Sequence, residues 1–241
     1  MTQQPSVVNI AGYHFVTLYN THSMQLELSE LCAELTLKGS IVLSQEGINL
    51  MLAGSEASID QFRKILTANT RFKDMTFKRS LSETLPFQKL LVKIKSHLVP
   101  GMPEIRPDRG DVAPNLSPLE LKQWYDEGRE FVIIDTRNDY EFDYGTFDHA
   151  LNLKLNQFGE LPEKLSMLDD SIKNKPVVMF CTGGIRCEKA APMAQKLGFK
   201  NVYQLEGGIL NYFERCGNSH YQGNCFVFDE RRALDNSLKN V

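Results

Sequence analysis

The first hundred residues alternate between short runs rich in β-branched and aromatic residues and longer runs with apolar residues at helical spacing. Such a pattern predicts strands and amphipathic helices in turn. Gly39 is expected to end the first helix, and Ser55 to cap the second. The expected elements are a strand over 13–19, a helix over 23–39, two strands around the turn "QEG" within 40–54, a helix over 55–68, and strands within 75–83 and 88–99. This β-α-β-β-α-β order is typical of a ferredoxin-like α+β domain, also called acylphosphatase-like, which we place at residues 1–98.

The pattern changes in residues 117–217, where nearly continuous apolar runs are separated by helical segments. Strands of a parallel sheet, buried on both faces, have this composition. Ser117 is expected to cap a helix with Pro118 at its first position, and Pro192 falls inside a later helix. The expected elements are helices over 117–128 and 186–199 and strands over 130–137, 176–180 and 201–208. We therefore expect a parallel-sheet α/β domain with helices on both faces.

Between these halves, residues 99–118 contain five prolines and two glycines. Proline restricts the backbone and cannot donate to a helix or a sheet, so neither element continues far through this stretch. We expect a semi-rigid linker at 99–116 and a C-terminal extension at 218–241.

The net charge of −3 hides an uneven distribution. Residues 60–109 contain eleven Lys and Arg against five acids, so the rest of the chain carries −9. A basic segment on an acidic protein is consistent with a nucleic-acid or anion footprint, and equally with charges that only cover solvated faces. On the strand expected near 88–99, Lys89, Lys93 and Lys95 share one face. Such a row suits phosphate contacts, but lysines also protect sheet edges from pairing, and the residues alone leave both interpretations open.

Composition narrows the class of protein further. No run of 18 apolar residues occurs, so no transmembrane helix is expected, and the start "MTQQPSVVNIAGYHF" lacks the basic and apolar regions of a signal peptide. Five cysteines at irregular spacing argue against a disulfide framework and for a reducing, cytoplasmic location. There is no CxxC pair and no local histidine arrangement, so no metal site is predicted, although an iron site built from distant residues stays open.

The stretch "VVMFCTGGIRC" at 177–187 carries the most specific chemical signal. Cys181 follows an apolar strand and precedes a helix, which is where open α/β sheets bind ligands. Gly183 and Gly184 allow several N–H groups to point at one centre, and a nest of donors at a helix N-terminus stabilises negative charge. Arg186 adds a fixed positive charge. We therefore predict a thiolate nucleophile rather than a small buried cysteine. Its predicted anion cradle is Thr182, Gly183, Gly184 and Ile185.

C-x4-R between a strand and a helix, followed by "NVYQLEGGI" and preceded by "IIDTRNDYEFDYGTF", resembles the rhodanese domains. The resemblance implies that Cys181 carries sulfur as a persulfide. It also implies that Asp135 and Arg137 support the site, with Glu141 at the start of the next helix. Cysteine and arginine are separated by four residues here, whereas related phosphatases use five to enclose a phosphate. Phosphatase activity is therefore not expected.

Where ordinary rhodaneses carry Gly-His-Ile, this chain has Gly145-Thr146-Phe147. This departure disfavours simple thiosulfate sulfurtransfer as the main role. Combined with "SQEGIN" at 44–49 and "GNCFVFDERRAL" at 223–234, the string "CTGGIRCE" is similar to the rhodanese-containing tRNA uridine hydroxylases. Longer members of that family continue into a cysteine-rich tail that this sequence does not contain.

This second resemblance implies oxidation of the wobble uridine of tRNA to 5-hydroxyuridine, with molecular oxygen as co-substrate, tRNA as partner, and Cys181 and Arg186 as catalytic residues. The sequence shows no flavin, haem or iron motif, so no cofactor is expected. The resemblance also turns the basic segment into a predicted tRNA contact through Lys78, Arg79, Lys89, Lys93 and Lys95. A persulfide-carrying sulfurtransferase and a binding module with a vestigial thiol are the alternatives.

The other four cysteines carry weaker signals than Cys181. Cys187, six residues after Cys181, either resolves an oxidised Cys181 by disulfide exchange or packs on the first turn of the helix. Cys216 and Cys225 are expected to be structural, and Cys32 to belong to the core of the first helix. The sequence gives no oligomeric state.

Overall fold

The computed structural model describes residues 7–241. Residues 1–6, where the first domain and the segment tested for a signal peptide begin, lie outside the described residues. The chain forms two compact units: an N-terminal unit that runs to Leu98 and includes Phe228–Arg231, and a C-terminal unit of Val99–Val227 and Arg232–Val241. The division differs from the expected one in two ways. The proline-rich segment 99–116 belongs to the C-terminal unit, and four residues of the expected extension belong to the N-terminal one.

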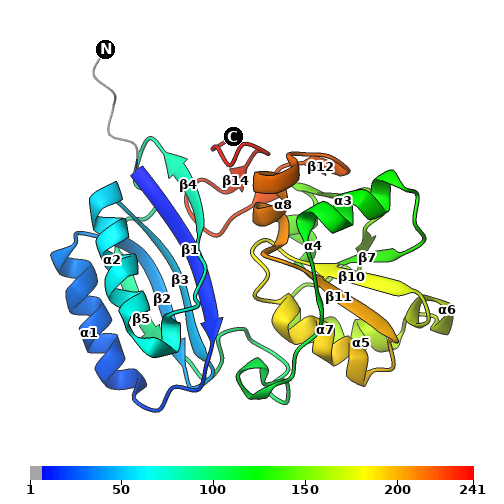
Figure 1. Cartoon of the computed structure of the whole chain (residues 1–241), viewed down its shortest axis with the longest axis horizontal. Coiled ribbons are helices and arrows are strands. Elements are labelled where there is room, and N and C mark those ends of the chain that lie inside the picture. Colours follow the sequence, from blue (N-terminus) through cyan, green and yellow to red (C-terminus); the bar gives the residue numbers. More distant parts are fainter. Residues whose placement is uncertain (1–6) are drawn as a thin grey trace. The chain divides into compact units, whose positions relative to one another are not determined.

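The N-terminal unit contains β1 (Val7–Phe15), α1 (Thr21–Glu34), β2 (Lys38–Ser44), β3 (Gly47–Gly54), α2 (Glu56–Ala68), the short 3₁₀ helix η1 (Thr70–Phe72), β4 (Lys78–Ser82) and β5 (Leu90–Ile94). Its strands form one sheet in the order β4-β1-β3-β2-β5. The first four strands in chain order pair antiparallel with one another, and β5 extends the sheet by pairing parallel to β2. Both helices cover the same face (Figure 1). This is the predicted ferredoxin-like arrangement with one added edge strand.

Two boundaries in this unit were predicted wrongly. The first strand covers Val7–Phe15 rather than 13–19, because its ladder with β3 ends where Phe15 pairs with Gly47. The first helix ends at Glu34, well before Gly39, because Thr36 takes a left-handed conformation with φ of 54° and turns the chain into β2. Ser55 caps α2 as predicted, its hydroxyl accepting from the Ser58 N–H at 3.1 Å.

Apolar side chains of α1, α2 and one face of the sheet make the core of this unit. Cys32 lies in it with 0% exposure, which confirms its assignment to the core. Leu26 of the same helix is 65% exposed, so the buried stripe of α1 is formed instead by Met24, Leu28 and Cys32. Burial in these apolar surroundings raises the pKa of the Cys32 thiol to about 12.

The C-terminal unit opens with the 3₁₀ helix η2 (Pro107–Arg109) and β6 (Asn115–Leu116). It continues with α3 (Pro118–Asp126), β7 (Val132–Asp135), α4 (Asp139–Phe142), β8 (Gly145–Phe147), β9 (Leu151–Asn152), the 3₁₀ helix η3 (Phe158–Glu160), α5 (Leu161–Ser166) and α6 (Asp170–Lys173). It ends with β10 (Pro176–Phe180), α7 (Cys187–Lys196), β11 (Asn201–Leu205), α8 (Gly208–Cys216), β12 (Tyr221–Gly223), β13 (Cys225–Phe226) and β14 (Ala233–Leu234).

Its main sheet has the order β6-β11-β10-β7-β9, with every pairing parallel. Within this unit α3 and α8 cover one face and α5 and α7 the other (Figure 1). The parallel sheet with helices on both faces is therefore confirmed. The pattern did not predict α8, because the glycines at 207 and 208 were assigned to the end of the preceding strand.

Helix α3 begins as expected. The Ser117 hydroxyl accepts from the Glu120 N–H at 3.3 Å, while the Ser117 N–H donates to the Glu120 carboxylate at 3.0 Å. This reciprocal pair is a capping box. Within residues 7–241, every helix is too short or too polar to cross a bilayer.

Candidate active site

Cys181 lies directly after β10, the central strand of the parallel sheet, and its residue exposure is 1%. The loop between β10 and α7 curls around the thiol, so that the Gly184 N–H donates to Cys181 Sγ at 3.1 Å. Gly184 has φ of +99°, a conformation that residues with a Cβ rarely adopt. The second glycine of the pair, Gly184, therefore allows the backbone to turn an N–H group toward the sulfur.

Burial by itself would raise the pKa of the Cys181 thiol. It is outweighed by a hydrogen bond from the Cys187 thiol, the positive charge of Arg186, and the backbone N–H groups of Arg186 and Gly184. The net effect lowers the pKa of Cys181 below that of an ordinary cysteine. The site therefore holds a buried thiolate surrounded by donors, which is the reactive form of the residue.

Arg186 is positioned by Glu141, a residue 45 positions away on α4. Arg186 Nη2 donates a hydrogen bond to Glu141 Oε2 at 2.9 Å, Arg186 Nη1 lies 2.8 Å from Glu141 Oε1 as an ion pair, and Glu141 is fully buried. A further contact, from the Asn138 N–H at 3.1 Å, fixes the same carboxylate. Burial would lower the pKa of Arg186, but the Glu141 charge raises it overall, so the cation is retained. Sequence reasoning named Glu141 only as the start of a helix and missed this role.

Asp135 and Arg137 form a second buried pair, with the Arg137 Nη2 2.6 Å from Asp135 Oδ2 and exposures of 0–1%. The same nitrogen donates to the Gly145 carbonyl at 2.6 Å, and the Thr146 hydroxyl donates to Asp135 at 3.1 Å. These contacts tie the end of β7 to β8. In the described part of the chain no hydrogen bond or ion pair joins this pair to Cys181. The structure thus places both residues beside the loop, where they hold the scaffold.

Cys187 is fully buried at the first position of α7. Its N–H donates to the Gly184 carbonyl at 2.9 Å, and its sulfur lies 3.7 Å from the Thr136 hydroxyl. Burial and the neighbouring Cys181 raise the pKa of the Cys187 thiol well above its ordinary value. The two cysteines of "CTGGIRC" are therefore adjacent in space, one favouring the thiolate and the other the thiol.

Helix α8 supports the loop from the other side. The N–H groups of Ile209 and Leu210 donate to the carbonyls of Cys181 and Thr182, at 3.0 and 3.1 Å. Gly208 has φ of +63°, and a Cβ there would lie 2.3 Å from the Cys181 carbonyl oxygen and 2.8 Å from the Gly184 nitrogen. Only glycine permits this close approach. Gly208 is a second site residue that the sequence analysis missed, although it lies in the quoted string "EGGI".

The remaining cradle residues are anchored by the chain that follows α8. The Thr182 hydroxyl donates to the Phe226 carbonyl of β13 at 3.3 Å, and Ile185 is half-buried. Cys225, next to Phe226, is fully buried, and burial raises the pKa of its thiol to about 12. Its structural assignment agrees with these surroundings.

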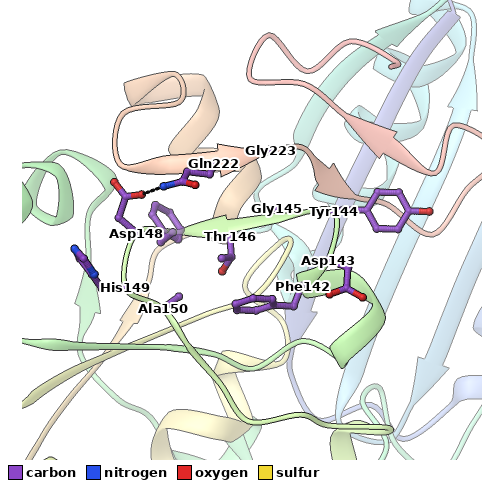
Figure 2. Close-up of a pocket in the computed structure, with 11 residues that line it drawn as sticks. Phe142, Asp143, Tyr144, Gly145, Thr146, Asp148, His149, Ala150, Gln222 and Gly223 are labelled. Carbon is purple, nitrogen blue, oxygen red and sulfur yellow. Dashed lines mark hydrogen bonds between the residues drawn. The ribbon is translucent and has the colours of Figure 1, made fainter.

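A pocket of about 440 Å³ lies along β8 in the same unit (Figure 2). It is bordered by Phe142, by the segment Gly145–Ala150 and by Gln222 and Gly223 of β12. It includes the Gly145-Thr146-Phe147 segment that departs from the rhodanese pattern. Cys181 does not line this pocket, so it is separate from the thiol.

The predicted basic residues do not form one cluster. Lys93 lies on β5, an edge strand of the N-terminal sheet, with Lys89 and Lys95 flanking it, and all three side chains are exposed. Across the described residues, no ion pair involves any of these three lysines. They make a short row of exposed cations, as the alternation of the strand predicted.

Lys78 and Arg79 lie on β4, at the opposite edge of that sheet. Their side chains point to opposite faces, because Lys78 pairs with Ala11 and Arg79 with the core residue Ile10. Arg79 also forms an ion pair with Glu56 of α2 at 2.6 Å. The structure thus separates these two residues from the lysine row, and the predicted tRNA contact through all five residues stays a prediction.

Comparison with known proteins agrees with this architecture. Residues 7–98 match the family model of the UPF0176 acylphosphatase-like domain, and residues 117–215 match that of the rhodanese-like domain. A solved rhodanese-like domain from Anabaena is 19% identical, covering 46% of this chain and 80% of that chain with a TM-score of 0.39.

Longer matches come from curated proteins. The tRNA uridine(34) hydroxylase of Cupriavidus necator is 48% identical over 239 residues, covering 97% of this chain and 84% of the relative. That of Bordetella petrii is 47% identical over 240 residues, covering 97% and 95%. Identity of this level across both units leaves one assignment. The chain belongs to the tRNA uridine(34) hydroxylase family.

Proposed function

We propose that this chain hydroxylates uridine 34 of cytoplasmic tRNA to 5-hydroxyuridine, with molecular oxygen as co-substrate and Cys181 as the essential thiol. The observation that carries the proposal is the Cys181 loop, in which a buried thiol is surrounded by Gly184, Cys187 and the fixed charge of Arg186. The names and identities of the relatives supply the substrate and the reaction.

The loop suits the chemistry of a pyrimidine ring. A thiolate adds readily to C6 of a uracil, and this addition places negative charge on C5, the carbon to be oxidised. Keeping Cys181 as a thiolate removes the need for a separate base at this step. Arg186, held by Glu141, maintains a positive charge beside the sulfur and the ring oxygen that develops charge.

We extend the proposal to tRNA contacts. The exposed row Lys89, Lys93 and Lys95 is placed to neutralise phosphates of the tRNA backbone, and such contacts bind without reading sequence. Lys78 and Arg79 are left out of this row, because they lie at the far edge of the sheet.

A sulfurtransferase is the second candidate, favoured by the four-residue cradle itself. An N–H group aimed at Cys181 Sγ and a neighbouring cation would stabilise a persulfide as well as a thiolate. Both candidates need Cys181, so the product decides between them.

The test uses tRNA without wobble modification, incubated with the full-length chain and excess dithiothreitol, in air and under argon, and digested for nucleoside mass spectrometry. We expect 5-hydroxyuridine in air, carrying label when the oxygen gas is isotopically labelled, and none under argon. Cys181→Ser should lower the yield at least about a thousandfold, as loss of a covalent nucleophile does. Cys216→Ser, a half-exposed cysteine at the end of α8, serves as the control and should match the parent.

Product formed by Cys181→Ser, or formed equally under argon, would contradict the proposal. No product from folded protein, together with rapid cyanolysis of thiosulfate that depends on Cys181, would instead support the sulfurtransferase.

A further inference from the structure

The loop holds two thiols, and the proposed reaction needs two electrons. Gly184 contacts both cysteines: its N–H donates to Cys181 Sγ at 3.1 Å, and its carbonyl accepts from the Cys187 N–H at 2.9 Å. The two side chains also act on each other, since Cys187 lowers the pKa of the Cys181 thiol and Cys181 raises that of Cys187. A disulfide requires its two sulfurs to approach to about 2 Å, and a loop that holds both cysteines through one residue keeps that approach local.

Their surroundings make the two cysteines different. Cys181 receives N–H groups and faces Arg186, whereas Cys187 faces the Thr136 hydroxyl at 3.7 Å and is enclosed by the first turn of α7. A thiolate beside a protonated thiol is the arrangement from which a disulfide forms once one sulfur is oxidised. Both residues are at most 1% exposed, so another protein's cysteine has poorer access to either sulfur than they have to each other.

We infer that Cys181 and Cys187 form a dithiol that supplies the two electrons for oxygen activation in this enzyme. The inference rests on the proposed function and adds to it the reductant for the reaction. Cys187 becomes a participant in the redox step instead of a packing residue.

The two thiols supply all the electrons needed for the oxidation of one uridine. Uridine, O₂ and the two thiols yield 5-hydroxyuridine, water and the Cys181–Cys187 disulfide. One oxygen atom forms a bond to C5, whose hydrogen leaves as a proton and is balanced by the proton of the new hydroxyl. The O–O bond breaks as the Cys187 sulfur takes the second oxygen and becomes a sulfenic acid. Cys181, released from the ring, then attacks that sulfur, and the oxygen leaves as water with the two thiol protons.

The disulfide must be reduced before the next turnover, and the class of reductant is a small-molecule or protein dithiol that acts by thiol–disulfide exchange. Product formation without such a reductant is therefore limited to one nucleoside per protein chain. This limit can be tested by measuring the oxidation of the two cysteines together with product formation.

The experiment starts from full-length protein that has been reduced and then freed of reductant under argon. Air and excess unmodified tRNA are added, and three quantities are followed: 5-hydroxyuridine, free thiols, and the Cys181–Cys187 disulfide by peptide mapping without reduction. We expect product up to one equivalent, loss of two thiols per chain in step with it, and resumed turnover when dithiothreitol is added. Cys216→Ser should lose the same two thiols.

Cys187→Ser and Cys187→Ala should form no such disulfide and yield at least tenfold less product under these conditions. Many turnovers of the parent without reductant, or product in step with no loss of thiols, would overturn the inference even if the Cys187 variants failed to fold. Unchanged yield from folded Cys187 variants would overturn it as well. Absence of product from the parent in excess dithiothreitol would instead contradict the proposed function, which keeps the two failures apart.

Discussion

The loop after β10 and the middle of helix α1 both bury a cysteine, with exposures of 1% at Cys181 and 0% at Cys32, yet the two thiols have opposite acidities. Burial raises the pKa of Cys32 to about 12, since its neighbours are apolar. At Cys181 the same cost is outweighed by donors and by Arg186, and the pKa falls. Burial alone therefore makes a thiol inert, and the polar groups that the fold aims at the sulfur make it reactive.

The largest effect is expected from removing the charge of Arg186, which should make the pKa of Cys181 more like the raised pKa of Cys32. Arg186→Gln leaves the Glu141 carboxylate buried without its partner, which costs about 3–5 kcal/mol of stability. It should also raise the pKa of Cys181. The thiolate fraction rises as pH rises through the pKa, so its ultraviolet absorbance should appear at higher pH in the variant. Chemical denaturation and a pH titration, each read against Cys181→Ser, measure the two effects.

A double variant separates charge from stability. Glu141→Gln with Arg186→Gln removes both charges, so we expect it to recover part of the lost stability and none of the lowered pKa. If the titration of the single or double variant coincided with that of the parent, Arg186 would not be what distinguishes Cys181 from Cys32.

Gly208→Ala should have a smaller effect on stability and on the pKa of Cys181, because it displaces the loop without changing any charge. The new Cβ would lie 2.3 Å from the Cys181 carbonyl oxygen, at a backbone φ of +63°. We expect a loss of about 1–3 kcal/mol and a rise in the pKa of Cys181 as its N–H donors move. Gly128→Ala is the matched control, since Gly128 has the same φ of +63° and a Cβ added there would have no atom within 4 Å.

The control should carry only the backbone strain, so it should unfold at a slightly lower denaturant concentration and titrate like the parent. Equal behaviour of the two variants would mean that contact with α8 does not shape the loop.

The glycines also show which parts of the site could be predicted from the sequence. "CTGGIRC" predicted the thiolate site because strand, loop and helix N-terminus are consecutive, and the two hydrogen bonds of Gly184 described above stay within residues 181–187. Glu141 and Gly208 were missed because their contacts with the loop depend on how α4 and α8 pack, and nothing local in the sequence reports that packing. Gly128 and Gly208 share the same backbone φ, and the atoms that lie beside Gly208 distinguish it.

In the N-terminal unit the element order was predicted correctly, and the errors concern distances across the sheet. Lys78 and Lys89 are only 11 positions apart in the chain, but three strands separate β4 from β5. Strand order depends on long-range pairing, which a local pattern does not encode. The end of α1 was misplaced for a local reason, because Thr36 adopts the left-handed conformation usually taken by glycine.

The smallest effect concerns the N-terminal unit, which contains Cys32 and which we expect to bind tRNA without taking part in thiol chemistry. Replacing Lys89, Lys93 and Lys95 together by Gln should reduce the salt dependence of tRNA binding by roughly 3 in the slope of log affinity against log salt concentration. It should leave the pKa of Cys181 and the yield at saturating tRNA unchanged. Lys78→Gln with Arg79→Gln is the matched control and should change the slope little, because Arg79 is paired with Glu56. Filter binding at several salt concentrations measures both. A triple variant that bound tRNA like the parent would assign the lysine row to protection of the β5 edge, the other role that the sequence left open.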